Sequence, residues 1–140
     1  EWSLMLTRQS PSYRKGFFPF PDESQQALIT LLEICEKDCY WGIWNQKKMI
    51  GFFMLRGWDL GFKKPSFGVL IDERHCHKGL AKLALQTAIS YCRLREVSDI
   101  ILKVDPENES ALKIYKGFGF KRTGFCPKVG HIIMNLELEV

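Results

Sequence analysis

A short run rich in charged residues, histidine and cysteine lies where an apolar segment gives way to an amphipathic one. Residues 72–78 follow the apolar segment 69–71 and precede a helix-like pattern that opens at Gly79. The first amides of a helix have no partner within the helix, and the helix dipole places partial positive charge there. Lys78 and Lys82 add full positive charges. This arrangement predicts a binding site for a phosphorylated ligand.

Two common phosphate-binding loops do not match this chain. A Walker A loop needs two glycines with four residues between them, followed by Lys and Ser or Thr, and no such run is present. A dinucleotide fingerprint needs Gly-x-Gly-x-x-Gly between a strand and a helix. Gly117 and Gly119 instead follow a helix-like segment, and the next glycine is misplaced at Gly124. The phosphate signal therefore rests on residues 76–81, Cys-His-Lys-Gly-Leu-Ala.

This window resembles the pyrophosphate loop of the GNAT superfamily of N-acetyltransferases, Gln/Arg-x-x-Gly-x-Gly/Ala. Gly79 and Ala81 match that pattern, and Cys76 departs from it. Residues 108–120 are similar to the family's second segment, in which Asn-x-x-Ala, a Leu-Tyr pair and Gly-Phe follow in order. The resemblance is clear over residues 65–125, weaker over 40–64, and carries no motif before Tyr40.

The resemblance implies an α/β fold with a mixed, mostly antiparallel sheet and helices on both faces. It also implies that the strand ending at Ile71 splays from the strand at 100–104. Acetyl-coenzyme A would bind as co-substrate in this gap, with backbone groups of the first strand holding its pantetheine arm and the loop holding its pyrophosphate. The residues so implied are Val69, Leu70, Ile71, His77, Lys78, Gly79, Leu80, Ala81, Lys82 and Asn108.

The resemblance assigns Tyr115 as the general acid that protonates the departing thiolate. A phenol with a pKa near ~10 is protonated at neutral pH and can donate. The implied function is transfer of an acetyl group to a primary amine of a small molecule, by direct attack in a ternary complex. Tyr115 also falls in a helical apolar stripe with Ala111, Ile114 and Phe118, so a purely structural role is the alternative.

The general base and the acceptor site are less defined. Asp59, Glu73, His75 and Asp72 lie near predicted strand ends, and a water-relayed proton transfer is an equal alternative. The turn at Trp58 and Asp59, together with the aromatic loop 13–20 that includes Phe18, is expected to shape the acceptor site. Segments 56–59 and 65–68 look similar to small acetyltransferases, some of which act on amino sugars.

Two other functions remain in view. One alternative is a zinc site formed by His75, Cys76 and His77 with the more distant Cys126 and His131. Adjacent residues just before the start of a helix cannot all point at one metal, so we expect no metal. The second alternative is a non-catalytic module that binds acyl-coenzyme A for sensing, which the departure at position 76 and the lack of an evident base both favour.

Composition agrees with one domain over residues 1–140. Hydrophobic content is 46%, charged content is 26%, and the net charge of +4 suits an anionic ligand. The lysines are too scattered to predict nucleic-acid binding, and no apolar run approaches the ~20 residues that span a membrane. Five cysteines without a framework spacing predict reduced thiols and a cytoplasmic location. We expect the protein to be a monomer or a homodimer. The first residue is Glu1 rather than Met, which favours a chain that lacks part of its natural start.

The elements that must position these residues follow from periodicity. The segment 100–104 is expected to be buried on both faces, and 132–140 to be a half-exposed strand near a sheet edge. Residues 9–21 are expected to form a loop. The pattern predicts strands at 4–7, 40–44, 49–56, 66–71, 100–104, 120–125 and 132–140, and helices from Asp22 or Ser24 to about 37, over 78–95, and from Asn108 to Gly117.

Overall fold

Among the residues that the computed structural model describes, 1–14 and 17–139, six strands form one sheet. Their order is β1-β2-β3-β4-β6-β5, and only the β3–β4 pair is parallel. The parts of our predictions that concern Lys15, Gly16 and Val140 lie outside the described residues. The strands are β1 (Cys39–Asn45), β2 (Lys48–Arg56), β3 (Ser66–Ile71), β4 (Asp99–Val104), β5 (Lys121–Cys126) and β6 (His131–Glu137).

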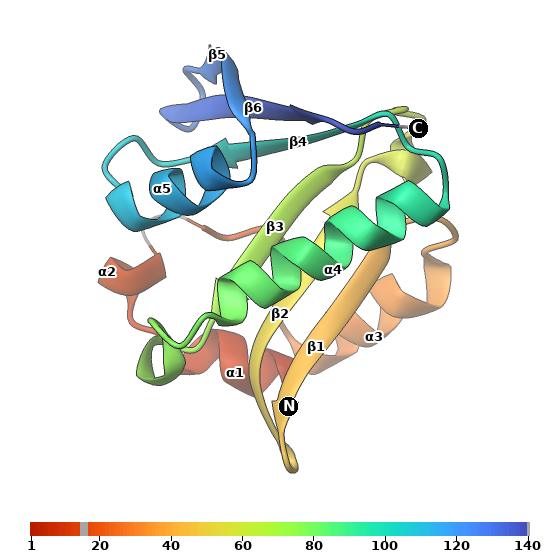
Figure 1. Ribbon diagram of the computed structural model, residues 1–140. Helices are drawn as coiled ribbons and strands as arrows, with labels where there is room; N and C mark the ends of the chain where they lie inside the picture. The colour runs from red at the N-terminus through yellow and green to blue at the C-terminus, as the bar shows by residue number, and fades with distance from the viewer. Residues whose placement is uncertain (15–16, 140) are drawn as a thin grey trace.

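Helices cover both faces of the sheet, which confirms the predicted architecture (Figure 1). The long helix α4 crosses one face, with α5 beside its first turns, while α1 and α3 pack on the other face. Two 3₁₀ turns, η1 (Trp58–Leu60) and η2 (Glu73–His75), flank β3. The α-helices are α1 (Trp2–Arg8), α2 (Pro11–Arg14), α3 (Gln25–Ile34), α4 (Leu80–Leu94) and α5 (Glu109–Gly117).

Each face of the sheet carries its own apolar core. The stripe predicted for α4 is buried against the sheet, and it consists of Ala84, Leu85, Ala88, Ile89 and Cys92. On the opposite face, side chains of α1 and α3 pack over β2 and β3, and the central members are Met5, Leu6, Leu28, Phe52, Met54 and Leu70. Burial of these two apolar faces is the main force that fixes the layers.

The central strand pair is splayed, as the resemblance implies. β3 and β4 share a single register pair, Ser66 with Ile101, and the Ile101 amide donates to the Pro65 carbonyl at 3.0 Å. Beyond that point the two strands diverge toward Ile71 and Val104. The unpaired edges of two central strands therefore face each other across a gap.

The prediction of a strand at 4–7 is wrong, because this segment belongs to α1. Met5 and Leu6 are buried, Trp2 packs against the same core, and Gln9 is buried one turn later. This spacing of three and four residues is that of a helix. A four-residue window was too short to reveal it. The expected loop 9–21 likewise contains the single helical turn α2.

One statement about the strands also needs correction. Ile100, Leu102 and Val104 are buried, but Lys103 is exposed, so β4 is covered on one face only. β6 lies near the sheet edge, as predicted, and β5 folds back outside it to become the edge strand itself. Solvent exposure of alternate residues in β6 arises from an uncovered face rather than from an edge.

The predicted helix caps are confirmed. The Ser24 hydroxyl accepts from the Ala27 amide at 3.2 Å, and the Asn108 side chain accepts from the Ala111 amide at 3.2 Å. α3 ends at Ile34, earlier than expected, and α5 ends at Gly117 as predicted.

Candidate functional site

A cavity of about 530 Å³ opens where β3 and β4 diverge. Its walls come from the loop before α4, the first turn of α4, one side of α5 and the segment around α2. Tyr115 lines it, and so does each residue that the resemblance assigns to coenzyme binding, except Lys78. The volume lies in the range of small-molecule sites.

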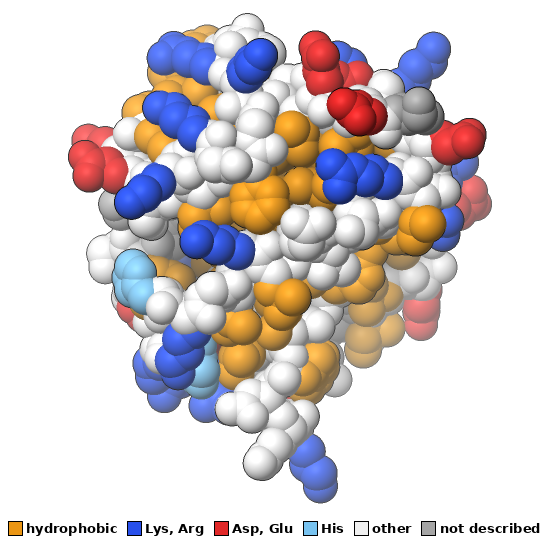
Figure 2. Space-filling view, in the orientation of Figure 1, with side chains coloured by type: hydrophobic (Ala, Val, Ile, Leu, Met, Phe, Trp, Pro, Cys, Tyr) orange, Lys and Arg blue, Asp and Glu red, His pale blue; other side chains and the backbone are white. Residues whose placement is uncertain are grey.

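The loop before α4 has an unusual backbone. His77 and Gly79 both have positive φ, at 64° and 82°, and a non-glycine residue in this region is uncommon. Gly79 is the N-cap of α4 and has no side chain to satisfy the first helix amides. Lys82 lines the cavity close to these amides, and Lys and Arg side chains gather along this side of the molecule (Figure 2). The helix start can therefore accept an anion.

The backbone of β3 presents free polar groups to the gap. The Asp72 amide donates to the Ile50 carbonyl at 2.8 Å, so Asp72 points its backbone groups at β2. Because alternate residues of an antiparallel ladder bond to the same neighbour, Leu70 also faces β2, while Val69 and Ile71 face the gap. The prediction that the Leu70 backbone binds pantetheine is therefore wrong, because β2 occupies those groups.

Tyr115 comes from α5 and points into the cavity. Its ring packs against Phe120, with centroids 5.8 Å apart. The hydroxyl has no hydrogen-bond partner among the described residues. Burial raises the pKa of Tyr115 to about 12. The phenol is therefore protonated at neutral pH and its proton is available for donation.

Asn108 serves as the N-cap of α5, and it also lines the cavity. Its Oδ1 atom accepts from the Ala111 amide and from the Ser110 hydroxyl, at 3.2 and 3.3 Å. The capping role is thus shown, whereas contact with the coenzyme stays a prediction.

Trp58 and Asp59 lie away from the cavity. The Asp59 carboxylate accepts from the backbone amides of Lys37 at 2.8 Å and Glu36 at 3.1 Å, and the first of these bonds is the main reason that the pKa of Asp59 is lowered. Trp58 packs near Tyr91, nine residues beyond Lys82 on α4, which is roughly 13 Å along the helix axis. The structure thus gives this turn a structural role and does not bring it to the predicted acceptor site.

The three other candidate bases differ in access. Glu73 accepts from the amide and hydroxyl of Ser10, at 2.8 and 3.2 Å, and is not among the residues lining the cavity. Asp72 is only 1% exposed. His75 does line the cavity, and its Nδ1 atom lies 3.8 Å from Asp72 Oδ1. Of the four candidate bases, His75 alone lines the cavity.

The segment around α2, where we predict the acceptor site, forms one wall of the cavity. Phe18 is 55% exposed and does not line the cavity, whereas Tyr13, Arg14 and Phe17 do. The Tyr13 hydroxyl donates to the Ile71 carbonyl at 2.6 Å, at the edge of the gap. The aromatic content of this loop was the available signal, but the sequence did not show which ring faces inward.

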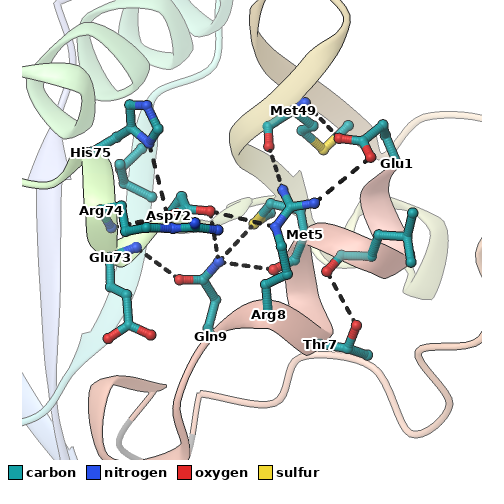
Figure 3. Close-up of polar contacts among 12 residues, drawn as sticks. Glu1, Met5, Thr7, Arg8, Gln9, Met49, Asp72, Glu73, Arg74 and His75 are labelled. Atoms are coloured by element: carbon teal, nitrogen blue, oxygen red, sulfur yellow. Dashed lines mark hydrogen bonds and ion pairs between the residues drawn. The ribbon is translucent and has the colours of Figure 1, made fainter.

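A polar network fastens this N-terminal segment to the end of β3 (Figure 3). The Gln9 amide nitrogen donates to Asp72 Oδ2 at 3.1 Å, and its oxygen accepts from the Glu73 amide at 2.7 Å. Arg8 and Arg74 guanidinium groups approach Asp72 at 3.8 and 3.6 Å. Burial alone would raise the pKa of Asp72, but hydrogen bonds from Arg74 and Gln9 and the two positive charges hold it below its ordinary value.

We expect Asp72→Asn to lower the free energy of unfolding at pH 7 by about 1–3 kcal/mol, because buried donors lose a charged acceptor. A depressed pKa gives stability that is present above the unfolded value and is lost as pH falls through the folded value. The difference between parent and variant should therefore shrink below about pH 4 in denaturant unfolding curves. A difference that stays constant down to pH 3 would contradict this role.

Other features bear on the alternatives. In the described part of the chain, no three His, Cys, Asp or Glu side chains gather closely enough to hold a metal ion. All five cysteines are described and are free thiols. Among the described helices, none is both long and apolar enough to cross a membrane.

Comparison with known proteins places this site in a family. The model of the acetyltransferase (GNAT) family matches residues 2–120. Human N-acetyltransferase 8 is 30% identical over 95 residues, which cover 63% of this chain and 42% of that protein. The chain thus spans about two fifths of the length of this curated relative.

Solved structures share the fold. An N-acetyltransferase from Staphylococcus aureus Mu50 superposes with a TM-score of 0.77 at 16% identity, covering 98% of this chain and 92% of that one. Spermidine N-acetyltransferase from Vibrio cholerae, in complex with CoA and spermine, gives 0.76 at 18% identity, covering 96% and 87%. Because the family model covers most of the sequence and the predicted motifs meet in one cavity, the chain belongs to the acetyltransferase (GNAT) family.

Proposed function

We propose that this chain is an acetyl-coenzyme A-dependent N-acetyltransferase that acts on a primary amine of a small molecule. The observation that carries the proposal is the single cavity that joins the α4 helix start, the free edge of β3 and the Tyr115 hydroxyl. These are an anion site, a strip of backbone hydrogen-bonding groups and a proton donor. An extended phosphorylated thioester would need all three.

The residues present fit that co-substrate. Val69 offers backbone groups at the gap, and Ile71 offers its amide, since the Ile71 carbonyl already accepts from Tyr13. An ideal Cβ at Gly79 would meet nothing within 4 Å, so the loop leaves room for a close approach. When bound, acetyl-coenzyme A would supply an acetyl group already activated as a thioester. The amides from Leu80 to Lys82 would hold the phosphates.

The chemistry then rests on protons held by the chain. The Ile71 amide faces the gap and can donate to a developing negative charge on a carbonyl oxygen there. Tyr115 Oη holds the proton for the leaving sulfur. Of the candidate bases, His75 lines the cavity and can accept the proton of an incoming ammonium group, and a water relay can do the same.

A thiol-release assay tests the proposal. Acetyl-coenzyme A should be incubated with the chain and a panel of amines: amino acids, amino sugars, polyamines and peptides. We expect at least one acceptor to release free thiol well above the hydrolysis blank, and the acetylated amine should appear by mass spectrometry.

The same samples separate the enzyme from a sensing module. If acetyl-coenzyme A raises the melting temperature but no amine releases thiol, the chain is a binding module and the catalytic proposal fails. If the coenzyme also leaves the melting temperature unchanged at millimolar concentration, the binding site itself is wrongly assigned.

A further inference from the structure

We infer that the acceptor carries a carboxylate besides its amine, and that Lys103 binds this group. The inference rests on the proposed function and deepens it. It follows from the kind and pairing of the charged groups at the end of the cavity away from α4.

The lining of the cavity is poor in acidic groups. Among the described residues that line it, Asp105 is the sole carboxylate, and its Oδ1 atom already accepts from the Glu107 amide at 2.9 Å. A polyamine needs negative charge along its length, because each ammonium group loses water when it binds. The cavity therefore does not suit a polycationic acceptor.

The cations of the lining have different roles. Arg14 is buried and is bound by the Glu23 carboxylate, with Nη1 donating to Oε1 at 2.7 Å. Lys82 lies on α4, beside the proposed phosphate site. Lys103 remains: it lines the cavity and makes no ion pair with a described residue.

The fold directs Lys103 toward the acceptor side. Leu102 and Val104 are buried in the core beneath α4 and α5, so the intervening side chain lies on the other face of β4. No described helix covers Lys103 on that face, and Lys103 lines the same cavity as Tyr13 and Phe17. β4 pairs Lys103 with Ile133, so His131, two residues away on β6, lies on the same face and also lines the cavity.

Within the described lining, this end of the cavity thus offers one cation without an ion pair, an imidazole and aromatic surface. An amine with a carboxylate and an apolar part matches it, as a free amino acid does. A lysine that meets a carboxylate forms a charge-assisted hydrogen bond, which is stronger than a neutral one.

The test compares two acceptors that differ in one charge, L-phenylalanine and L-phenylalaninamide. Spermidine and glucosamine are assayed in parallel as amines without a carboxylate. The two phenylalanine compounds differ in amine pKa, so the readout is the effect of a variant on each. We expect Lys103→Met to lower kcat/KM about tenfold or more for L-phenylalanine, mainly through KM, and to change it less than twofold for the amide. Lys103→Arg should restore part of the loss.

Lys121→Met is the matched control. Lys121 is an exposed lysine of β5 that does not line the cavity, so the variant removes the same charge and should leave both acceptors unaffected. Equal effects of Lys103→Met on the acid and the amide would overturn the inference. The inference would also be overturned if the enzyme acetylated only spermidine or glucosamine, but the proposed function would then still hold. Thiol release from no amine at all would overturn both.

Discussion

Replacing Tyr115 with Phe is expected to lower kcat by about 10²-fold or more, which is the usual contribution of a general acid. Phe keeps the ring and its contact with Phe120, so the fold and the affinity for acetyl-coenzyme A should change little. What is lost is the phenolic proton of Tyr115, which no described residue engages. Steady-state thiol release, with coenzyme affinity measured separately by thermal shift, separates the two effects.

Two other tyrosines sharpen this experiment. Burial also raises the pKa values of Tyr40 and Tyr13 to about 12. Tyr40 belongs to the core on the opposite face of the sheet, so Tyr40→Phe controls for the loss of a buried hydroxyl. Tyr13 lines the cavity, but its hydroxyl is engaged with Ile71. A hundredfold loss in Tyr13→Phe and a normal rate in Tyr115→Phe would show that Tyr13 is the acid.

The dependence of the parent's rate on pH should also show that Tyr115 is the general acid. A general acid with a raised pKa keeps its proton until the pH approaches that value, so the pKa of Tyr115, about 12, predicts no loss of rate up to pH 10. The rate should instead rise with pH as the acceptor loses its ammonium proton. A descending limb between pH 7 and pH 9 would point to an acid other than this phenol.

Gly79→Ala is expected to abolish coenzyme binding. At about 100 times Kd the coenzyme should stabilise the parent by ~2.7 kcal/mol, or roughly 8 °C in Tm for a chain of this size. Gly79 lies where the loop meets the first helix amides, and a methyl group there would keep a pyrophosphate from the backbone. The variant should show no shift at the same concentration.

The backbone at this position makes a control necessary. Gly79 has φ of 82°, a conformation that strains any side chain, so Gly79→Ala should lower the stability of the free protein as well. Gly61 has φ of 92°, and a Cβ there would also meet nothing within 4 Å, but it lies at the end of η1, outside the cavity lining. Gly61→Ala should lose similar intrinsic stability and keep the full coenzyme shift. Loss of the shift in both variants would mean that strain, not the loop, is responsible.

The sequence alone determined the elements whose signals are local. The caps at Ser24 and Asn108, the apolar stripe of α4 and the residues of β3 follow from hydrogen-bonding types and periodicity within a few turns. The motif around Gly79 and the one around Tyr115 also sufficed to predict that both segments meet at one ligand. Each is a short-range pattern, and the hydrogen bonding and side-chain periodicity that it reflects are the same in any fold.

The tertiary structure decided which groups remain free. Asp59 looked available in the sequence, but the amides after α3 occupy its carboxylate, and the backbone of Leu70 is engaged by β2. Conversely, Lys103 looked like part of a buried strand and proves to line the cavity, because no helix of the described chain covers that face of β4. Availability depends on contacts between segments distant in sequence, and composition and periodicity carry no record of those contacts.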